Sequence, residues 1–462
     1  MYIILDVSLL FGQSRTEFPT IRFDADARIT QDARSSSVLD ARTFAYTALV
    51  ASGTQDENIN TYLERLDSLY QNCDKRIAAS TSHEDKIEAT LHFLYDEVIS
   101  TYSENQTRLD IALSEGSYNC VSSAILFMYM MKREGVAVSA VETPAHAFCT
   151  VQIDGKQITV ETTNPWGVNP GVKKQVANDT LRGKKYVTVP ATKYANSHAV
   201  DDRRIIALVY MNRIVLLQKK NNQEATVGLA CDALILQNNS QIASDLVHQC
   251  IYNVCANYTR SKRNEDCLLL IKKARTQFGD SSSFKQCVSA ALNNLCNDCV
   301  TQRKYDECIA VIKSNKDMVD QAEYDSLYET ALTNKLTDVV NTKSFDEALG
   351  EIHAQKSVLN NNNYLKLVEY AYSAGSSALE KNGDWLGVAS LCEQGLQEIP
   401  GNSTLSRIRA TDRNNYALTV HNKAATLYNA GDIDGARKII EDGLKIVDES
   451  AVLKNDLKRL CP

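Results

Sequence analysis

The feature that most constrains the fold of this chain is a spacing of small and apolar residues that recurs through its second half. In the clearest unit, residues 420–444, these residues follow at intervals of 3, 4, 5, 4 and 3: Ala424, Leu427, Gly431, Ala436, Ile440 and Gly443. Intervals of three and four put side chains on one face of a helix, and the central glycine marks a turn. The pattern therefore predicts two helices that touch through their small residues.

The same spacing can be traced back along the chain. Its corresponding positions, 40, 41, 40, 40 and 48 residues apart, are Val227, Cys267, Cys308, Ala348, Val388 and Ala436. This pattern resembles the tetratricopeptide family of helical repeats, whose period is about 34 residues, so longer helices or connections are expected here. We expect about six units over residues 201–462, forming an all-α solenoid whose extended surface binds a protein or peptide partner.

Composition favours a soluble, mostly helical chain and excludes several classes of protein. Seven prolines and 19 glycines in 462 residues are few, which favours long helices over a loop-rich β protein. A net charge of −7 is a poor basis for binding a polyanion, so no nucleic-acid partner is expected. Basic residues within 173–204 lack interleaved aromatic residues, which indicates a solvated linker. No apolar run reaches the roughly 18–20 residues of a transmembrane segment.

Two features point to different compartments. Thirteen cysteines, an odd number, favour the reducing cytoplasm. Residues 1–11 are apolar, but they lack a positive flank and contain an aspartate, so they form a short strand, a frayed helix or the remnant of a secretion signal. A cytoplasmic location is expected. In an exported or periplasmic chain, Cys255 with Cys267 and Cys296 with Cys308 would be disulfide candidates, because each pair joins positions expected to touch.

The Cys296-x-x-Cys299 motif raises the alternative of a zinc site. No histidine is spaced to complete a tetrahedral ligand set, and both cysteines fall on packing positions of a repeat. Thiols that fill helix contacts are the favoured interpretation, and no metal or cofactor is expected.

The stretch from residue 101 to 200 differs from the repeats because it combines a helix with strands. Asp154-Gly155 is a strong signal for a hairpin, because a type I′ turn needs positive φ at both central positions. The predicted elements of the first 200 residues are helices over Asp56–Tyr70, Ile87–Ile99 and Cys120–Arg133 and strands over Ala145–Ile153, Lys156–Thr162 and Lys185–Pro190.

Three residues of this stretch predict a catalytic arrangement. Cys120 begins a helix, where the helix dipole and free N–H groups favour the thiolate. His146 follows 26 residues later at the start of the first strand of the hairpin, and Glu161 lies 15 residues further on the second. With a two-residue turn, cross-strand partners sum to 309, so Glu161 faces Phe148 and lies diagonal to His146. Glu161 can then orient the imidazole that takes the thiol proton.

The stretch from Tyr118 to Gly167 resembles the core of the transglutaminase-like superfamily of papain-fold thiol enzymes. The matching segments are Y-N-C-V-S-S-A-I-L-F, T-P-A-H-A-F-C-T-V and V-E-T-T-N-P-W-G. The resemblance implies an α+β papain-like domain over residues 51–200, after an unassigned segment at 1–50. It also implies that Cys120 is the nucleophile, His146 the base and Glu161 the orienting acid, where aspartate is commoner. Bacterial members with helical repeats after the core look similar.

The expected function is thiol-dependent hydrolysis of an amide by a peptidase-like or amidase-like enzyme whose repeats recruit the substrate. Hydrolysis is favoured over cross-linking because nothing marks a second site for an amine. The backbone N–H of Cys120 is one expected oxyanion donor, and the second is the side chain of Asn119, Gln106 or Tyr102. The alternative is a catalytically inactive scaffold whose repeats bind the partner.

Overall fold

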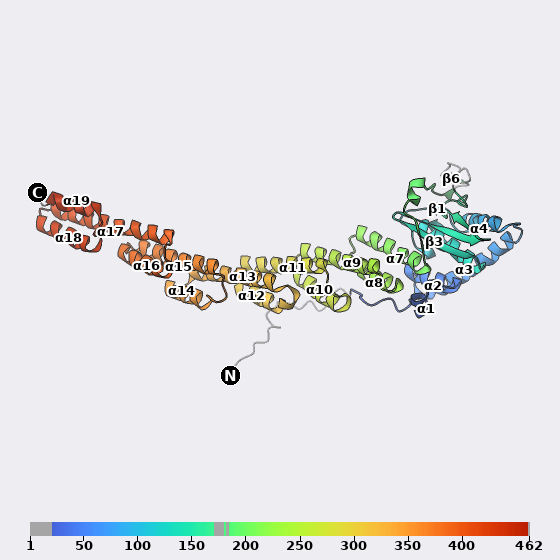
Figure 1. The fold of residues 1–462 in the computed structure, drawn as a ribbon, viewed down its shortest axis with the longest axis horizontal. Helices are drawn as coiled ribbons and strands as arrows, with labels where there is room; N and C mark the ends of the chain where they lie inside the picture. The colour runs from blue at the N-terminus through green and yellow to red at the C-terminus, as the bar shows by residue number, and fades with distance from the viewer. Residues whose placement is uncertain (1–20, 171–179, 182–183, 461–462) are drawn as a thin grey trace, which may run out of the picture. The chain divides into compact units, whose positions relative to one another are not determined.

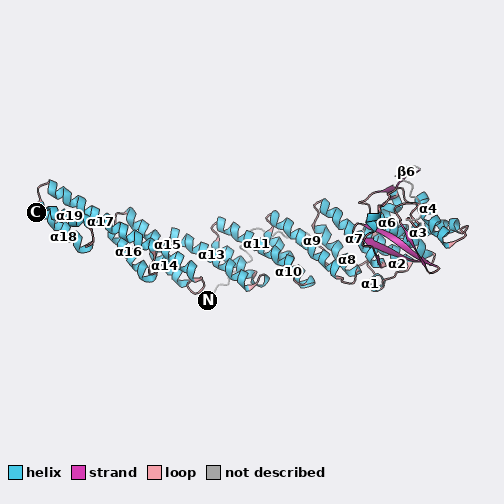
Figure 2. Cartoon of the chain, turned by 45° about the horizontal axis from the view of Figure 1, so that its top comes forward, coloured by secondary structure: helices cyan, strands magenta, loops and turns pink. Residues whose placement is uncertain are grey.

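The computed structural model of the chain describes residues 21–170, 180–181 and 184–460. The predictions for Met1–Phe11 and for part of the basic stretch lie outside these residues. The chain divides into two compact units, Met1–Cys287 and Val288–Pro462. The described strands all lie in the first unit, and the second is built from helices (Figures 1 and 2). Within the described ranges, no helix is long and apolar enough to cross a membrane.

The first unit begins with six helices and contains two small sheets. Its helices are α1 Gln31–Ser35, α2 Ala41–Ser52, α3 Asp56–Ile77, α4 His83–Glu97, α5 Leu109–Glu115, α6 Cys120–Arg133, α7 Asp202–Lys219, α8 Glu224–Leu236, α9 Gln241–Arg260 and α10 Asn264–Phe278, with a 3-10 helix, η2, at Ala191–Tyr194. Its strands are β1 Thr101–Tyr102, β2 Ser117–Tyr118, β3 Ala137–Thr143, β4 His146–Ile153, β5 Lys156–Val160, β6 Thr180–Leu181, β7 Lys184–Lys185 and β8 His198–Val200.

The hairpin of β4 and β5 has the predicted turn and register. Asp154 and Gly155 both have positive φ, 50° and 74°, as a type I′ turn requires. Cys149 pairs with Val160 and Ile153 with Lys156, and both pairs sum to the predicted 309. Glu161 follows the last residue of β5, so the ladder ends just before it.

The larger sheet differs from the sequence-based prediction at its other edge. Its strand order is β5-β4-β3-β8, with β3 and β8 paired antiparallel, and the sequence analysis had assigned neither strand. The predicted third strand over Lys185–Pro190 is wrong. Only Lys185 of that range is in a strand, and β7 belongs to the smaller sheet, of order β2-β1-β7-β6. Pairing with β1, distant in sequence, decided where β7 lies.

Helix α6 is the centre of the first unit and begins and ends where predicted. Asn119 caps its N-terminus in a capping box with Ser122, and Lys132 and Arg133 occupy its last turn, where cations are favourable. The side chains from Val121 to Met131 are all buried. A helix that is buried all round must be covered on every side. α6 packs against β3 and β4 and also against α2 and α4 (Figure 2).

The first unit extends beyond the predicted boundary at residue 200 because ion pairs join the following helices to its core. Lys132 of α6 contacts Asp202 of α7 at 2.6 Å, with side chains only 9% and 5% exposed. Arg204 of α7 pairs with Glu142 of β3 at 2.6 Å. At the other end, α2 contributes Phe44 to the same core, so the unassigned segment 1–50 is also partly folded into this unit.

The second unit is a succession of helices. After α11, Ser282–Thr301, which begins in the first unit, they are α12 Tyr305–Ser314, η3 Lys316–Met318, α13 Gln321–Thr342, α14 Phe345–Ala354, α15 Asn361–Lys381, α16 Trp385–Glu398, α17 Ser403–Asn429, α18 Ile433–Ile446 and α19 Ala451–Leu460. Consecutive helices contact one another, and so do α13 with α15 and α15 with α17. Each helix therefore packs on its neighbour in sequence and on the next helix but one.

The recurring positions of the sequence occupy equivalent places in six helices. They are the fourth residues of α8, α10, α12, α14, α16 and α18, namely Val227, Cys267, Cys308, Ala348, Val388 and Ala436. All six are buried, with at most 1% of the side chain exposed. A small or β-branched residue at this place lets the second helix of each pair approach the first closely.

The paired cysteines of the repeats lie next to each other as free thiols. The Cys255 thiol contacts those of Cys267 and Cys287, a third partner that the sequence analysis had not included. In the second unit, Cys296 packs against Cys308. The predicted pairs are therefore neighbours, but none of the cysteines that the structure describes is in a disulfide.

Candidate active site

The three residues predicted to form a catalytic arrangement come together in the first unit. Cys120 is the first residue of α6, His146 the first of β4, and Glu161 directly follows β5. His146 Nε2 lies 2.7 Å from Glu161 Oε2, and the Cys120 thiol hydrogen-bonds the same imidazole. Because Glu161 occupies Nε2, Nδ1 is the ring nitrogen left for the sulfur. Glu161 is fully buried, His146 is 8% exposed, and Cys120 is partly exposed, so solvent reaches the group nearest the surface.

The electrostatics of the site favour a protonated imidazole. Burial by itself lowers the pKa of His146, but the hydrogen bonds to Cys120 and Glu161 outweigh it and raise the pKa to about 10. A buried carboxylate beside a histidine stabilises its charged form. An imidazolium held between a thiol and a carboxylate is the arrangement in which a cysteine is activated as a nucleophile.

Glu161 is held by three groups besides His146. Its Oε1 accepts hydrogen bonds from the Thr163 backbone N–H at 3.0 Å and the Thr163 hydroxyl at 2.7 Å. Its Oε2 also accepts from the Tyr194 hydroxyl at 2.8 Å. Four hydrogen bonds satisfy a buried carboxylate and set the direction of its free lone pairs. The sequence analysis had used neither Thr163 nor Tyr194 as a site residue.

Tyr194 reaches the site from η2, a segment whose neighbouring residues are exposed. Its ring lies edge-on to His146, with centroids 6.1 Å apart, and contacts Phe148 at 5.1 Å. Burial and the charge of Glu161 raise the pKa of Tyr194, so its hydroxyl stays a donor. Only the E-T-T motif after the strand could have indicated Thr163, because its hydroxyl is two residues from Glu161. Tyr194 is 33 residues away, and no local pattern marks it.

The N-terminus of α6 is fixed against the strand that delivers Glu161. Ser123 Oγ lies 2.9 Å from Thr162 Oγ1, which ties the first turn of the helix to the end of the hairpin. Gly167 closes the loop behind Glu161: its carbonyl accepts the Glu161 N–H at 2.8 Å. A Cβ at position 167 would lie 1.9 Å from the Glu161 carbonyl oxygen, so only glycine permits this approach.

Of the three side chains considered for the oxyanion hole, the structure leaves Tyr102 best suited. The Asn119 amide is used twice, because Oδ1 caps α6 and Nδ2 donates to the Glu104 carbonyl at 3.2 Å. Gln106 Oε1 accepts from the Arg108 N–H at 2.9 Å. Burial and the neighbouring Cys120 raise the pKa of Tyr102, so its phenol is a proton donor close to the sulfur at neutral pH.

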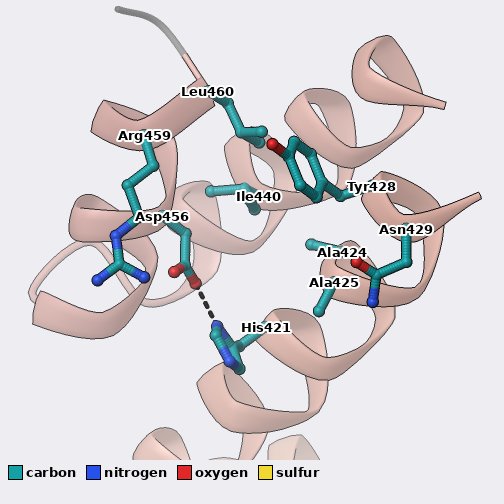
Figure 3. Close-up of a pocket in the computed structure, with 9 residues that line it drawn as sticks. All are labelled: His421, Ala424, Ala425, Tyr428, Asn429, Ile440, Asp456, Arg459 and Leu460. Carbon is teal, nitrogen blue, oxygen red and sulfur yellow. Dashed lines mark hydrogen bonds and ion pairs between the residues drawn. The ribbon is translucent and has the colours of Figure 1, made fainter. Parts of the chain in front are cut away.

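A pocket in the second unit lacks these chemical groups. It has a volume of about 220 Å³ and is lined by His421, Ala424, Ala425, Tyr428, Asn429, Ile440, Asp456, Arg459 and Leu460. Figure 3 shows His421 of α17 and Asp456 of α19 facing each other across it, joined by an ion pair. No cysteine, serine or threonine lines this pocket, so it provides a binding surface without a nucleophile.

Neither metal binding nor sequence relatives assign a role to the chain. Among the residues that the structure describes, no group of three or more histidine, cysteine, aspartate or glutamate side chains is arranged to hold a metal ion, and this includes Cys296 and Cys299. No known protein family and no curated protein sequence matches the chain.

Proposed function

We propose that this chain is a thiol-dependent amide hydrolase of the transglutaminase-like superfamily, with a papain-like core and tetratricopeptide-like repeats that recruit a protein or peptide. The observation that supports it most is the buried hydrogen bond of 2.7 Å between His146 and Glu161, on an imidazole that also bonds the thiol of Cys120. Each of these residue types is common in a protein core, but the chain of three bonded groups is typical of an activated nucleophile.

In the proposed reaction, Cys120 Sγ attacks the carbonyl carbon of an amide while its proton resides on His146. The carbonyl oxygen becomes an oxyanion, which accepts hydrogen bonds from the Cys120 N–H and the Tyr102 phenol. When the C–N bond breaks, His146 gives its proton to the leaving amine, and a thioester remains. Water then attacks the thioester, His146 takes one of its protons and returns it to the sulfur, and a carboxylic acid leaves. Glu161 keeps its charge and holds the ring throughout.

Alkylation of the native protein tests the nucleophile. A brief reaction with iodoacetamide at pH 6, followed by peptide mass analysis, should label Cys120 well ahead of Cys299, because ordinary thiols with a pKa of about 8.5 react slowly there. Cys299 is a suitable internal reference because it is also partly exposed and burial raises its pKa. His146→Ala should remove the advantage of Cys120. Equal labelling of the two cysteines would contradict an activated thiol.

Turnover of an amide tests the reaction itself. Denatured casein and glutamine-containing peptides, incubated with the protein, should release new termini or ammonia, and Cys120→Ala should abolish the release. If a defined partner binds the repeats and no amide is turned over by the wild-type chain, the alternative function applies, in which the core is an inactive part of a binding scaffold.

A further inference from the structure

A second pocket of the first unit lies between the C-terminal part of α7 and α9. It has a volume of about 220 Å³ and is lined by Gln218, Asn221, Gln223, Asn253, Ala256, Asn257 and Arg260. Five of these seven residues carry a side-chain amide, and none is acidic. A side-chain amide offers the same donor and acceptor as a peptide group. The composition of the pocket thus matches the backbone of a polypeptide.

Two polar groups of this pocket lack a partner within the protein. Gln223 Oε1 is buried and accepts no hydrogen bond. An unsatisfied buried acceptor is costly, so this oxygen is suited to an N–H donor that enters the pocket. Arg260 is exposed and forms no ion pair with any residue in the described ranges. Its guanidinium is suited to a carboxylate.

The pocket is connected to the candidate active site through the loop 103–108. On one side of this loop, the Asn119 amide donates to the Glu104 carbonyl at 3.2 Å, next to Cys120. On the other side, Lys219 Nζ contacts Asn105 Oδ1 at 3.5 Å, and Lys219 adjoins Gln218 of the pocket. The loop therefore separates the start of α6 from the end of α7 by a single layer of chain.

We propose that this pocket is the substrate-binding subsite of the thiol site, where amide side chains hold the backbone of an extended polypeptide and Arg260 pairs with a carboxylate of it. The proposal rests on the proposed function for the chemistry at Cys120, but the binding itself does not require turnover. The carboxylate comes either from an acidic side chain or from the C-terminus of the bound chain. A substrate would thus be selected by the backbone it extends and by one negative charge.

The test measures peptide binding to the full-length Cys120→Ala protein, so that hydrolysis cannot interfere. Three fluorescent pools of random-sequence decapeptides are compared by anisotropy: one with an internal aspartate and an amidated end, one without acidic residues but with a free C-terminus, and one with neither carboxylate. Arg260→Ala should weaken the first or the second pool by about tenfold, which identifies the source of the carboxylate, and leave the third unchanged. A loss in no pool would contradict the role of Arg260.

Variants of the pocket amides test the backbone contacts. Asn257→Leu should weaken all three pools by about tenfold, and Asn257→Asp, which keeps the size of the side chain, should also weaken them. The matched control is Tyr428→Ala in the equally large pocket of the second unit (Figure 3), which should leave binding unchanged. Circular dichroism verifies that each variant keeps its helices.

The outcomes separate the two proposals. If the pools bind the parent protein no better than they bind Asn257→Leu, or if only Tyr428→Ala weakens them, the subsite is overturned. If binding follows the predicted pattern but the wild-type chain hydrolyses none of the pools, the thiol chemistry fails and the binding site stands.

Discussion

The residues of the candidate site have distinct tasks that single substitutions can separate. Cys120 and His146 exchange a proton, Glu161 holds the imidazole, and Tyr194 and Thr163 hold Glu161. Tyr102 stands apart from this chain of contacts because it lies near the sulfur without bonding the imidazole. Its proposed role appears only when an oxyanion forms.

Tyr102→Phe should therefore lower amide turnover without lowering alkylation. Loss of one oxyanion donor costs roughly 100- to 1,000-fold in kcat, whereas iodoacetamide reacts with the sulfur through no oxyanion. Steady-state kinetics on a cleaved peptide and the alkylation rate of Cys120, measured on the same preparations, check the expectation. Equal losses in both measurements would mean that Tyr102 acts on the thiol and not on the oxyanion.

The raised pKa of His146 makes stability depend on pH. It is about 10 in the folded chain, against about 6.5 for an unfolded histidine, so folding favours the protonated ring. This contribution is complete below pH 6.5 and is lost as the pH rises towards 10. The free energy of unfolding of the first unit, from urea titrations, should decrease over that window. His146→Asn should remove this part of the decrease, whereas His198→Asn, at a histidine 65% exposed, should retain it.

Among the elements, helix α6 links stability to the site because its capping residue adjoins the nucleophile. Asn119 accepts from the N–H groups of Val121 and Ser122, at 3.0 and 3.1 Å. α14 has the same kind of capping box, formed by Ser344 and Glu347, far from any candidate nucleophile in its surroundings. The two helices form a matched pair for substitution.

Asn119→Ala and Ser344→Ala should each destabilise the unit that contains them by about 1 kcal/mol, the usual cost of a lost N-cap. Only Asn119→Ala should also slow the alkylation of Cys120, because the first turn of α6 is no longer fixed. Urea titration and alkylation at pH 6 measure the two effects. A normal alkylation rate in Asn119→Ala would show that the contact between Ser123 and Thr162 alone positions the thiol.

For the molecule as a whole, the two compact units have separate hydrophobic cores, and each contains one tryptophan. Trp166 packs on Tyr186 in the first unit, and Trp385 begins α16 in the second. Leu126 and Ile352 are fully buried in the respective cores. Units with separate cores can unfold at different denaturant concentrations.

Single-tryptophan proteins should therefore report two independent transitions. With Trp385→Phe, fluorescence follows the first unit, and with Trp166→Phe it follows the second. Leu126→Ala should lower the urea midpoint of the first signal only, and Ile352→Ala that of the second only, each by the equivalent of about 2–5 kcal/mol. If either substitution shifts both signals equally, the chain unfolds as one cooperative unit.

The sequence by itself determined the features that depend on neighbouring residues. The bounds of α6 follow from its cap and its apolar run, the register of the β4–β5 hairpin follows from Asp154-Gly155, and six buried positions such as Ala436 follow from helical spacing. These signals lie within a few turns of the chain, so they can be recognised without knowing the fold. Cys120, His146 and Glu161 could be predicted because the hairpin and the helix start carry them.

Only the tertiary structure decided the features that join distant segments. Tyr194 bonds Glu161 from 33 residues away, β7 pairs with β1 instead of extending the larger sheet, and Cys287 completes a cluster with Cys255. The pocket between α7 and α9 likewise exists only once the two helices pack side by side. Such contacts depend on which surfaces meet in the folded chain, and the composition and spacing of a single segment carry no record of its partner.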